Sequence, residues 1–153
     1  MKNNRYEYQT EDELHYFEFV SVGTKGEVRK IVEYSKVSLN NIYNLAFGDY
    51  DENLDGLNDK TITNNGDSLK VLATVVSTLY AFTGKYPFNW VFATGSNEVR
   101  TRLYRMGISN NLEELKEDFF VYGMKSDETF EEFVLGEDYL GFLVTRKNKS
   151  INL

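Results

Sequence analysis

The residues best suited to chemistry lie in one segment, residues 94–105. A short apolar run ends at Ala93, and a polar stretch then opens a segment with helical spacing and three arginines. A helix start exposes unpaired backbone N–H groups and the positive end of the peptide dipoles, which together favour an anion. The predicted ligand-binding residues are Thr94, Gly95, Ser96, Asn97, Arg100, Arg102 and Tyr104.

The arginines of this segment also have a structural interpretation, because surface arginines are usually solvated or paired with carboxylates. The chain carries 24 acidic residues against 17 basic ones, so partners for Arg100, Arg102 and Arg105 are abundant. The sequence leaves three roles open for these side chains: anion binding, contact with a partner, and internal ion pairing.

An acidic segment earlier in the chain resembles the start of a calcium-binding loop. Asp51, Asn53 and Asp55 alternate ahead of Gly56, a spacing in which oxygen ligands converge on a hard cation. The pattern fails at the twelfth position, where Ile62 stands in place of a bidentate glutamate. We therefore predict no metal site, and Asp51, Asn53 and Asp55 are the weak candidates for holding a cation.

Composition excludes several other kinds of chemistry. The chain has no cysteine and one histidine, His15, which excludes disulfides, thiolate catalysis and multi-histidine metal sites. A formal charge of −7 disfavours nonspecific binding to nucleic acid or to a membrane surface, since both require a positive surface. For His15 we expect a structural or exposed role.

Length and composition also predict how the chain is organised. With 153 residues, 41% of them hydrophobic and 15% aromatic, the chain is expected to form a single domain over residues 1–153, with residues 1–13 loosely ordered. No run approaches the roughly 20 apolar residues of a membrane-spanning helix. The N-terminus lacks the apolar core of a signal peptide, so we expect a cytoplasmic protein.

Hydrophobic periodicity predicts an antiparallel meander followed by a long buried helix. Leu69, Leu72, Val76 and Leu79 form the apolar stripe of that helix, and residues 65–67 supply its cap. The fold class is α+β, with a mixed, mainly antiparallel sheet in the order β-β-β-α-β-α-β-β. The predicted strands are residues 16–22, 27–37, 41–48, 89–93, 119–124 and 139–146, and the predicted helices are residues 67–86 and 97–106, with a helical turn at 110–115.

Residues 14–147 resemble a family of uncharacterised bacterial proteins of similar length. The resemblance carries no assigned activity. The matching stretches are residues 41–49, 64–67, 71–75, 93–96 and 100–105.

The later half of the chain also resembles the GNAT acetyltransferase fold in the order of its elements. In that family a strand leads to a glycine-rich turn and a helix that hold the pyrophosphate of acetyl-CoA, and a later helix carries a leucine–tyrosine pair before a glycine. Leu103 and Tyr104, followed by Gly107, match that helix. The resemblance implies that Tyr104 would protonate the leaving thiolate and that acetyl-CoA would be the cofactor.

The turn that would hold the pyrophosphate departs from the GNAT pattern. Residues 63–68 are neither basic nor rich in glycine, and acidic residues precede them. Carboxylates beside a pyrophosphate repel it, so we expect a GNAT-like scaffold without acetyltransferase activity and without a cofactor. The acidic residues are Asp49, Asp51, Glu52, Asp55 and Asp59.

Three classes of function remain open on this basis. The first, which we favour, is a small interaction module that holds a protein partner, for example within a toxin–antitoxin-type pair. The second is a binder of a small anionic or nucleotide-like ligand, and the third is an acyl-CoA-dependent N-acetyltransferase with an atypical turn. An exposed aromatic patch containing Tyr6, Tyr8, Tyr16 or Phe130 would favour the first. A pocket lined by Thr94, Ser96, Arg100 and Tyr104 would favour the second.

Overall fold

The computed structural model describes residues 4–58 and 60–147. The strands are β1 (Gln9–Thr10), β2 (Tyr16–Gly23), β3 (Gly26–Ser38), β4 (Ile42–Asp51), β5 (Gly56–Asn58), β6 (Trp90–Ala93), β7 (Phe119–Met124), β8 (Phe130–Glu132) and β9 (Gly141–Arg146). The helices are α1 (Ser68–Lys85), α2 (Glu98–Asn110) and α3 (Leu112–Asp118). The predicted α+β class is confirmed.

The strands form one sheet in the spatial order β1-β2-β3-β4-β6-β9-β7-β8, with β5 paired to β4. Neighbouring strands are antiparallel except β4 and β6, which are parallel because the chain crosses over through α1 between them. The sheet is therefore mixed and mainly antiparallel, as predicted. The parallel register runs only from Ile42 opposite Trp90 to Asn44 opposite Phe92, so beyond Asn44 the two strands are no longer paired.

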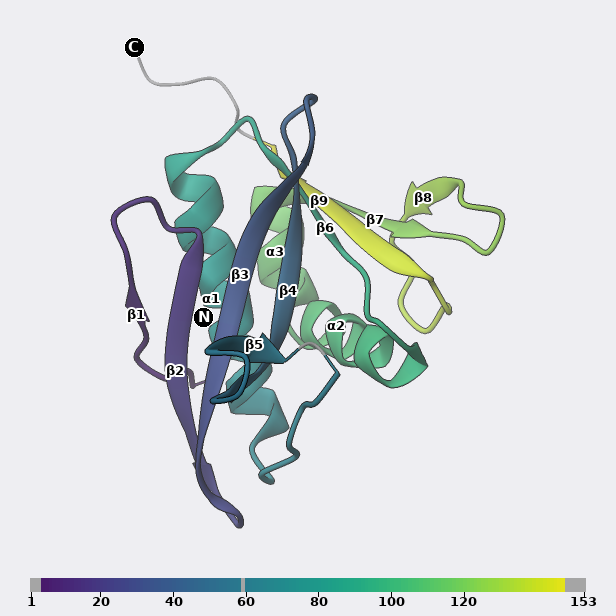
Figure 1. Cartoon of the computed structure of the whole chain (residues 1–153). Coiled ribbons are helices and arrows are strands. Elements are labelled where there is room, and N and C mark those ends of the chain that lie inside the picture. Colours follow the sequence, from purple (N-terminus) through teal and green to yellow (C-terminus); the bar gives the residue numbers. More distant parts are fainter. Residues whose placement is uncertain (1–3, 59, 148–153) are drawn as a thin grey trace.

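All three helices pack on the same face of the sheet (Figure 1). Leu45 of β4, Val91 of β6 and Val144 of β9 point toward them and are buried. On α1, the predicted stripe is buried at Leu72, Val76 and Leu79, whereas Leu69 in the first turn is 54% exposed. No helix of the described residues covers the opposite face of the sheet.

Part of the N-terminal segment contacts the core. Tyr6 stacks on Phe19 with ring centroids 5.8 Å apart, and Tyr8 meets Phe17 edge-on at 5.1 Å. The short strand β1 pairs with β2. Residues 1–3 lie outside the described residues.

Several local predictions differ from the structure. The segment predicted to join the last two strands contains β8, which pairs with β7, and the acidic segment contains β5, which pairs with β4. Helix α2 does not stop at Gly107 but continues to Asn110, because glycine is tolerated inside a helix and this one packs against Leu72. Helix α3 begins at Leu112 within the predicted helical turn at residues 110–115, and its N-cap residue, Asn111, makes no side-chain cap hydrogen bond.

Within the described residues, no helix is both long enough and apolar enough to cross a membrane.

Candidate functional site

The junction between β6 and α2 has the predicted strand–turn–helix form. Asn97 is the N-cap of α2, and its side chain accepts a hydrogen bond from the backbone N–H of Arg100 at 3.0 Å. The N–H of Gly95 donates to the Thr101 hydroxyl at 3.1 Å, and the Thr94 hydroxyl donates to the carbonyl of Leu140 at 2.7 Å. Other groups of the protein therefore already accept hydrogen bonds from the donors that an anion bound at this helix start would need.

The structure separates six of the seven predicted site residues into two groups, while the seventh, Ser96, is exposed and lines neither the core nor the groove described below. Arg100 is 4% exposed and Tyr104 is 8% exposed, and both point from α2 toward the place where β4 has left β6. Nη2 of Arg100 donates a hydrogen bond to the carbonyl of Phe47, and the Tyr104 hydroxyl donates one to the carbonyl of Leu45 at 3.5 Å. These two side chains therefore donate hydrogen bonds to β4 carbonyls beyond Asn44, where β6 is no longer paired with β4.

The Arg100 guanidinium is a cation inside the core. Its Nη1 is buried and has no hydrogen-bond partner, and no carboxylate of the described residues forms an ion pair with it. The structural interpretation of the three arginines in this segment was that they are solvated or paired with acids. Arg105 contacts Asp138 and Arg102 is exposed, so both fit it, whereas buried Arg100 does not.

A groove of about 1080 Å³ runs along the outer side of this junction. It lies between the start of α2 and the chain that leads into and out of β8. Of the predicted site residues, Thr94, Gly95, Asn97 and Arg102 line it. The charged residues of its wall are Glu98, Arg102, Arg105, Lys125, Glu131, Glu137 and Asp138. Acids and bases nearly balance there, so the groove is not a strongly positive site.

The turn that precedes α1 is held by internal contacts. The backbone N–H and hydroxyl of Thr63 donate to the Asp49 carboxylate at 3.0 and 2.6 Å. Asn65 accepts from the N–H of Lys25 at 2.6 Å and donates to the carbonyl of Gly26 at 2.9 Å. This turn therefore fastens the β2–β3 hairpin to the start of α1 and does not face the α2 junction.

Two predictions about this region need correction. Asp67 is the N-cap residue of α1 but makes no side-chain cap. Its carboxylate instead accepts from the hydroxyls of Tyr6 at 2.5 Å and Ser21 at 2.6 Å. Asp49, which we counted among the acids that would repel a phosphate, is buried and paired with Lys30 at 2.5 Å. Its charge is therefore compensated. Asp59 lies outside the described residues.

The weak metal candidates use their oxygens inside their own loop. Asp51 accepts from the N–H of Asn53 at 2.8 Å and from the amide of Asn58 at 3.1 Å. Asp55 accepts from the Tyr50 hydroxyl at 2.9 Å. Over residues 4–58 and 60–147 no group of three histidine, aspartate or glutamate side chains is placed to hold a metal ion.

His15 packs between two tyrosines. Its ring stacks on Tyr43 and Tyr86, with centroids 5.7 and 5.5 Å away. The Nε2 atom is buried without a hydrogen-bond partner. This placement is a packing role, in keeping with the structural alternative for His15.

The sequence analysis missed an aromatic surface on the side of the sheet that carries no helix. Trp90 and Phe92 of β6 alternate with buried Val91, and Phe120 and Tyr122 of β7 alternate with buried residues in the same way. Trp90 lies 6.3 Å from Tyr122, and Phe92 lies 6.5 Å from Phe130 of β8, between ring centroids. We call this surface the aromatic face; its members are Trp90, Phe92, Phe120, Tyr122 and Phe130.

The signal for the aromatic face was present in the sequence. Residues 119–124 place large apolar side chains on both sides of a strand, which is typical of a strand that is covered on both faces. In this sheet one side of the strand meets the helices, and the other stays half-exposed or exposed. In the predicted strand at residues 89–93, only Asn89 and Val91 are buried.

Comparison with known proteins identifies the family of the chain but no individual relative. No curated protein and no solved structure matches it. A family model described as a family of unknown function (DUF6934) matches residues 2–147. Since this match covers almost the whole chain, the protein belongs to that family.

Proposed function

We propose that this protein is a small interaction module without acetyltransferase activity, built on a GNAT-like scaffold, and that it holds a protein partner through its aromatic face. The observation that carries the proposal is the exposure of large aromatic side chains on one side of the sheet. Phe120 and Phe130 are each 45% exposed, and Trp90, Phe92 and Tyr122 are half-buried beside them.

A contiguous apolar surface of this kind lowers solubility unless something covers it, and such surfaces mark interaction sites or ligand-binding grooves. Large aromatic side chains are enriched at protein interfaces. Tryptophan and tyrosine are also the residues that contribute most to binding energy at interfaces. Of the aromatics whose exposure would favour a protein partner, Phe130 belongs to this face. Tyr6 and Tyr8 pack on the core, and Tyr16 is half-buried on β2, where its hydroxyl donates to Glu18. The proposed surface therefore lies over β6, β7 and β8, with β9 between β6 and β7.

The environment of Tyr104 and of the turn before α1 supports the absence of acetyltransferase activity. A general acid must reach the reacting group, but the Tyr104 hydroxyl is buried against the carbonyl of Leu45. In the turn, the N–H of Gly66 donates to the Asn64 side chain and that of Thr63 to Asp49. These donors are therefore occupied and do not form an open cradle for a pyrophosphate.

A small anionic ligand in the groove beside α2 is the second candidate function. Its volume is in the range of ligand pockets, and Arg102 and Lys125 line it. Four carboxylates line the same wall, however, and they would repel a polyanion. The uncovered aromatic face therefore gives the stronger argument for a protein partner.

The proposed interface is tested by co-purification from the native host with quantitative mass spectrometry. In the double variant Phe120→Ser and Phe130→Ser, we expect a partner that travels with the wild-type chain to be reduced at least about tenfold, since hot-spot aromatics contribute 2 kcal/mol or more each. The matched control is Val20→Ser with Val22→Ser, two exposed residues that face the same side of the sheet from β2. Equal partner recovery from both double variants would reject the aromatic face as the interface.

Thermal denaturation with acetyl-CoA tests the absence of acetyltransferase activity. A ligand at 100 times its dissociation constant stabilises a protein by about 2.7 kcal/mol, which raises the melting temperature by several degrees. We expect no shift at millimolar acetyl-CoA. A reproducible increase would favour the transferase instead.

A further inference from the structure

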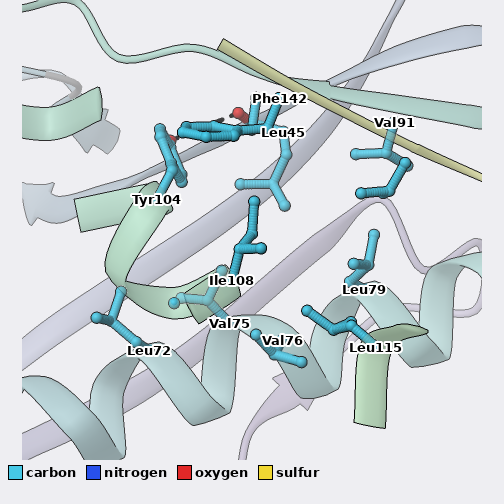
Figure 2. Close-up of a pocket in the computed structure, with 13 residues that line it drawn as sticks. Leu45, Leu72, Val75, Val76, Leu79, Val91, Tyr104, Ile108, Leu115 and Phe142 are labelled. Carbon is cyan, nitrogen blue, oxygen red and sulfur yellow. Dashed lines mark hydrogen bonds between the residues drawn. The ribbon is translucent and has the colours of Figure 1, made fainter. Parts of the chain in front are cut away.

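A small cavity lies in the core beneath α2, on the side of that helix opposite the groove (Figure 2). Its volume is about 50 Å³, and its walls come from all three helices and from β4, β6 and β9. Leu45 and Phe142 line it from the sheet, Leu72 and Val76 from α1, and Leu115 from α3. These side chains are each at most 7% exposed, so this part of the wall is buried in the core, whereas Ala93 and Ile108 of the same wall are half-buried.

The cavity is apolar. Every side chain that lines it is a hydrocarbon except Tyr104, whose hydroxyl is directed at the carbonyl of Leu45. The carbonyl of Gly107, another wall residue, accepts from the Asn111 side chain at 2.8 Å. A buried water needs two to four polar partners, and this wall does not offer them. The space is therefore suited to an apolar occupant.

Gly107 leaves part of this space open. It lies inside α2, where alanine is the more favourable residue, and its backbone is helical. A Cβ at this position would lie 3.6 Å from Leu72, an ordinary van der Waals distance. At Gly95 and Gly123, by contrast, a Cβ would overlap neighbouring atoms, so glycine is required there. Neither conformation nor packing requires glycine at position 107, and its effect is to keep a methyl-sized volume empty.

From this cavity and its glycine we infer that the protein has a binding site beneath α2 for a small, uncharged, apolar molecule. An apolar cavity of about 150 Å³ holds benzene or xenon. In proportion, a cavity of about 50 Å³ admits roughly two or three carbon-sized atoms. A charged ligand is excluded because the wall offers nothing to pair with it. This site is separate from the aromatic face and does not depend on the proposed function.

Xenon is the probe for this site, followed through the methyl groups of the folded full-length chain by NMR. We expect shifts that saturate with xenon pressure at Leu72, Ile108 and Leu115, and no such shifts at Val20 or Leu57, which are remote from the cavity. Gly107→Ala fills the space and should abolish the saturable shifts. The matched control is Gly84→Ala, a helical glycine of α1 whose added Cβ would lie 3.9 Å from Arg146 and outside the cavity. It should bind xenon as the wild type does.

Two results would overturn the inference: a wild-type chain without saturable shifts at the lining methyls, or a Gly107→Ala chain that keeps them. If Gly107→Ala fails to fold, Val76→Ala replaces it, because it enlarges the same cavity. That variant should keep the saturable xenon shifts at the lining methyls, and they should saturate at lower xenon pressure than in the wild type. Loss of xenon binding in folded Val76→Ala would equally reject the site.

Discussion

The arginines of α2 differ in their surroundings, and the difference has a measurable consequence. Arg100 is buried and donates to the carbonyl of Phe47, whereas Arg102 is exposed at the groove. We expect Arg100→Ala to lower the free energy of unfolding by about 2 kcal/mol, since a hydrogen bond from a charged donor is lost together with packing. Arg102→Ala should change it by less than about 0.5 kcal/mol. Urea denaturation of the two variants measures both values.

Equal, small effects from these two variants would contradict the structural role of Arg100. They would also return Arg100 to the set of residues available for a ligand.

Tyr16 makes the free energy of unfolding depend on pH in the alkaline range. Burial, together with the Glu18 carboxylate that accepts from its hydroxyl at 3.1 Å, raises the pKa of Tyr16 from 10.0 to about 12. The folded state favours the protonated phenol, so this stabilisation is complete below pH 10 and is lost as the pH rises from 10 to about 12. We expect the free energy of unfolding to fall across that window, and to fall less in Tyr16→Phe. Urea titrations at a series of pH values measure the difference, and identical slopes for the two proteins would contradict it.

At the scale of elements, the β6–α2 junction depends on a close approach at Gly95. A Cβ there would overlap the backbone nitrogen of Thr101 and lie 2.5 Å from the Cβ of Arg100. We expect Gly95→Ala to destabilise the fold by about 1–3 kcal/mol, because the helix start must move away. Gly84→Ala is the control and should stabilise by up to about 1 kcal/mol, since it adds a methyl group to a helix without a clash. Thermal denaturation distinguishes the opposite signs, and a neutral Gly95→Ala would show that the junction is loose.

The sequence was sufficient for the long elements because their periodicity was strong. The meander of β2, β3 and β4 and the helix α1 were predicted within a few residues of their bounds. The short strands β1, β5 and β8 were missed, since two or three residues carry too little periodicity to be recognised and their pairing is set by the strands beside them. The end of α2 was predicted too early because a glycine commonly signals a helix end in sequence. In the structure the helix continues past Gly107, which lies beside Leu72 of α1.

The candidate site was predicted only in part, for a reason of geometry. The sequence identified the α2 junction, but helical spacing alone does not say which face of α2 meets the sheet. Arg100 and Tyr104 are four residues apart and share the face that turns to β4, whereas Arg102 faces the groove. The aromatic face arises from strands that are distant in sequence and come near one another only when the sheet forms, with β9 between β6 and β7.

At the scale of the whole molecule, the two faces of the sheet differ in what covers them. One face carries all three helices and the core, while the other exposes the aromatic residues of β6, β7 and β8. We therefore propose that stability depends on one side of the sheet and partner binding on the other. A substitution on the aromatic face should change binding with little change in folding, in contrast to one at Arg100 or Gly95.

Site-specific photocrosslinking in the native host tests this account most directly. A photoreactive phenylalanine analogue at Phe120 or Phe130 keeps an aromatic ring on the aromatic face, and the same analogue at Val22 is the control on β2. The account predicts that one protein is crosslinked from Phe120 and Phe130 and not from Val22. The same adducts from all three positions, or none from the aromatic face, would contradict the claim that this surface holds a protein partner.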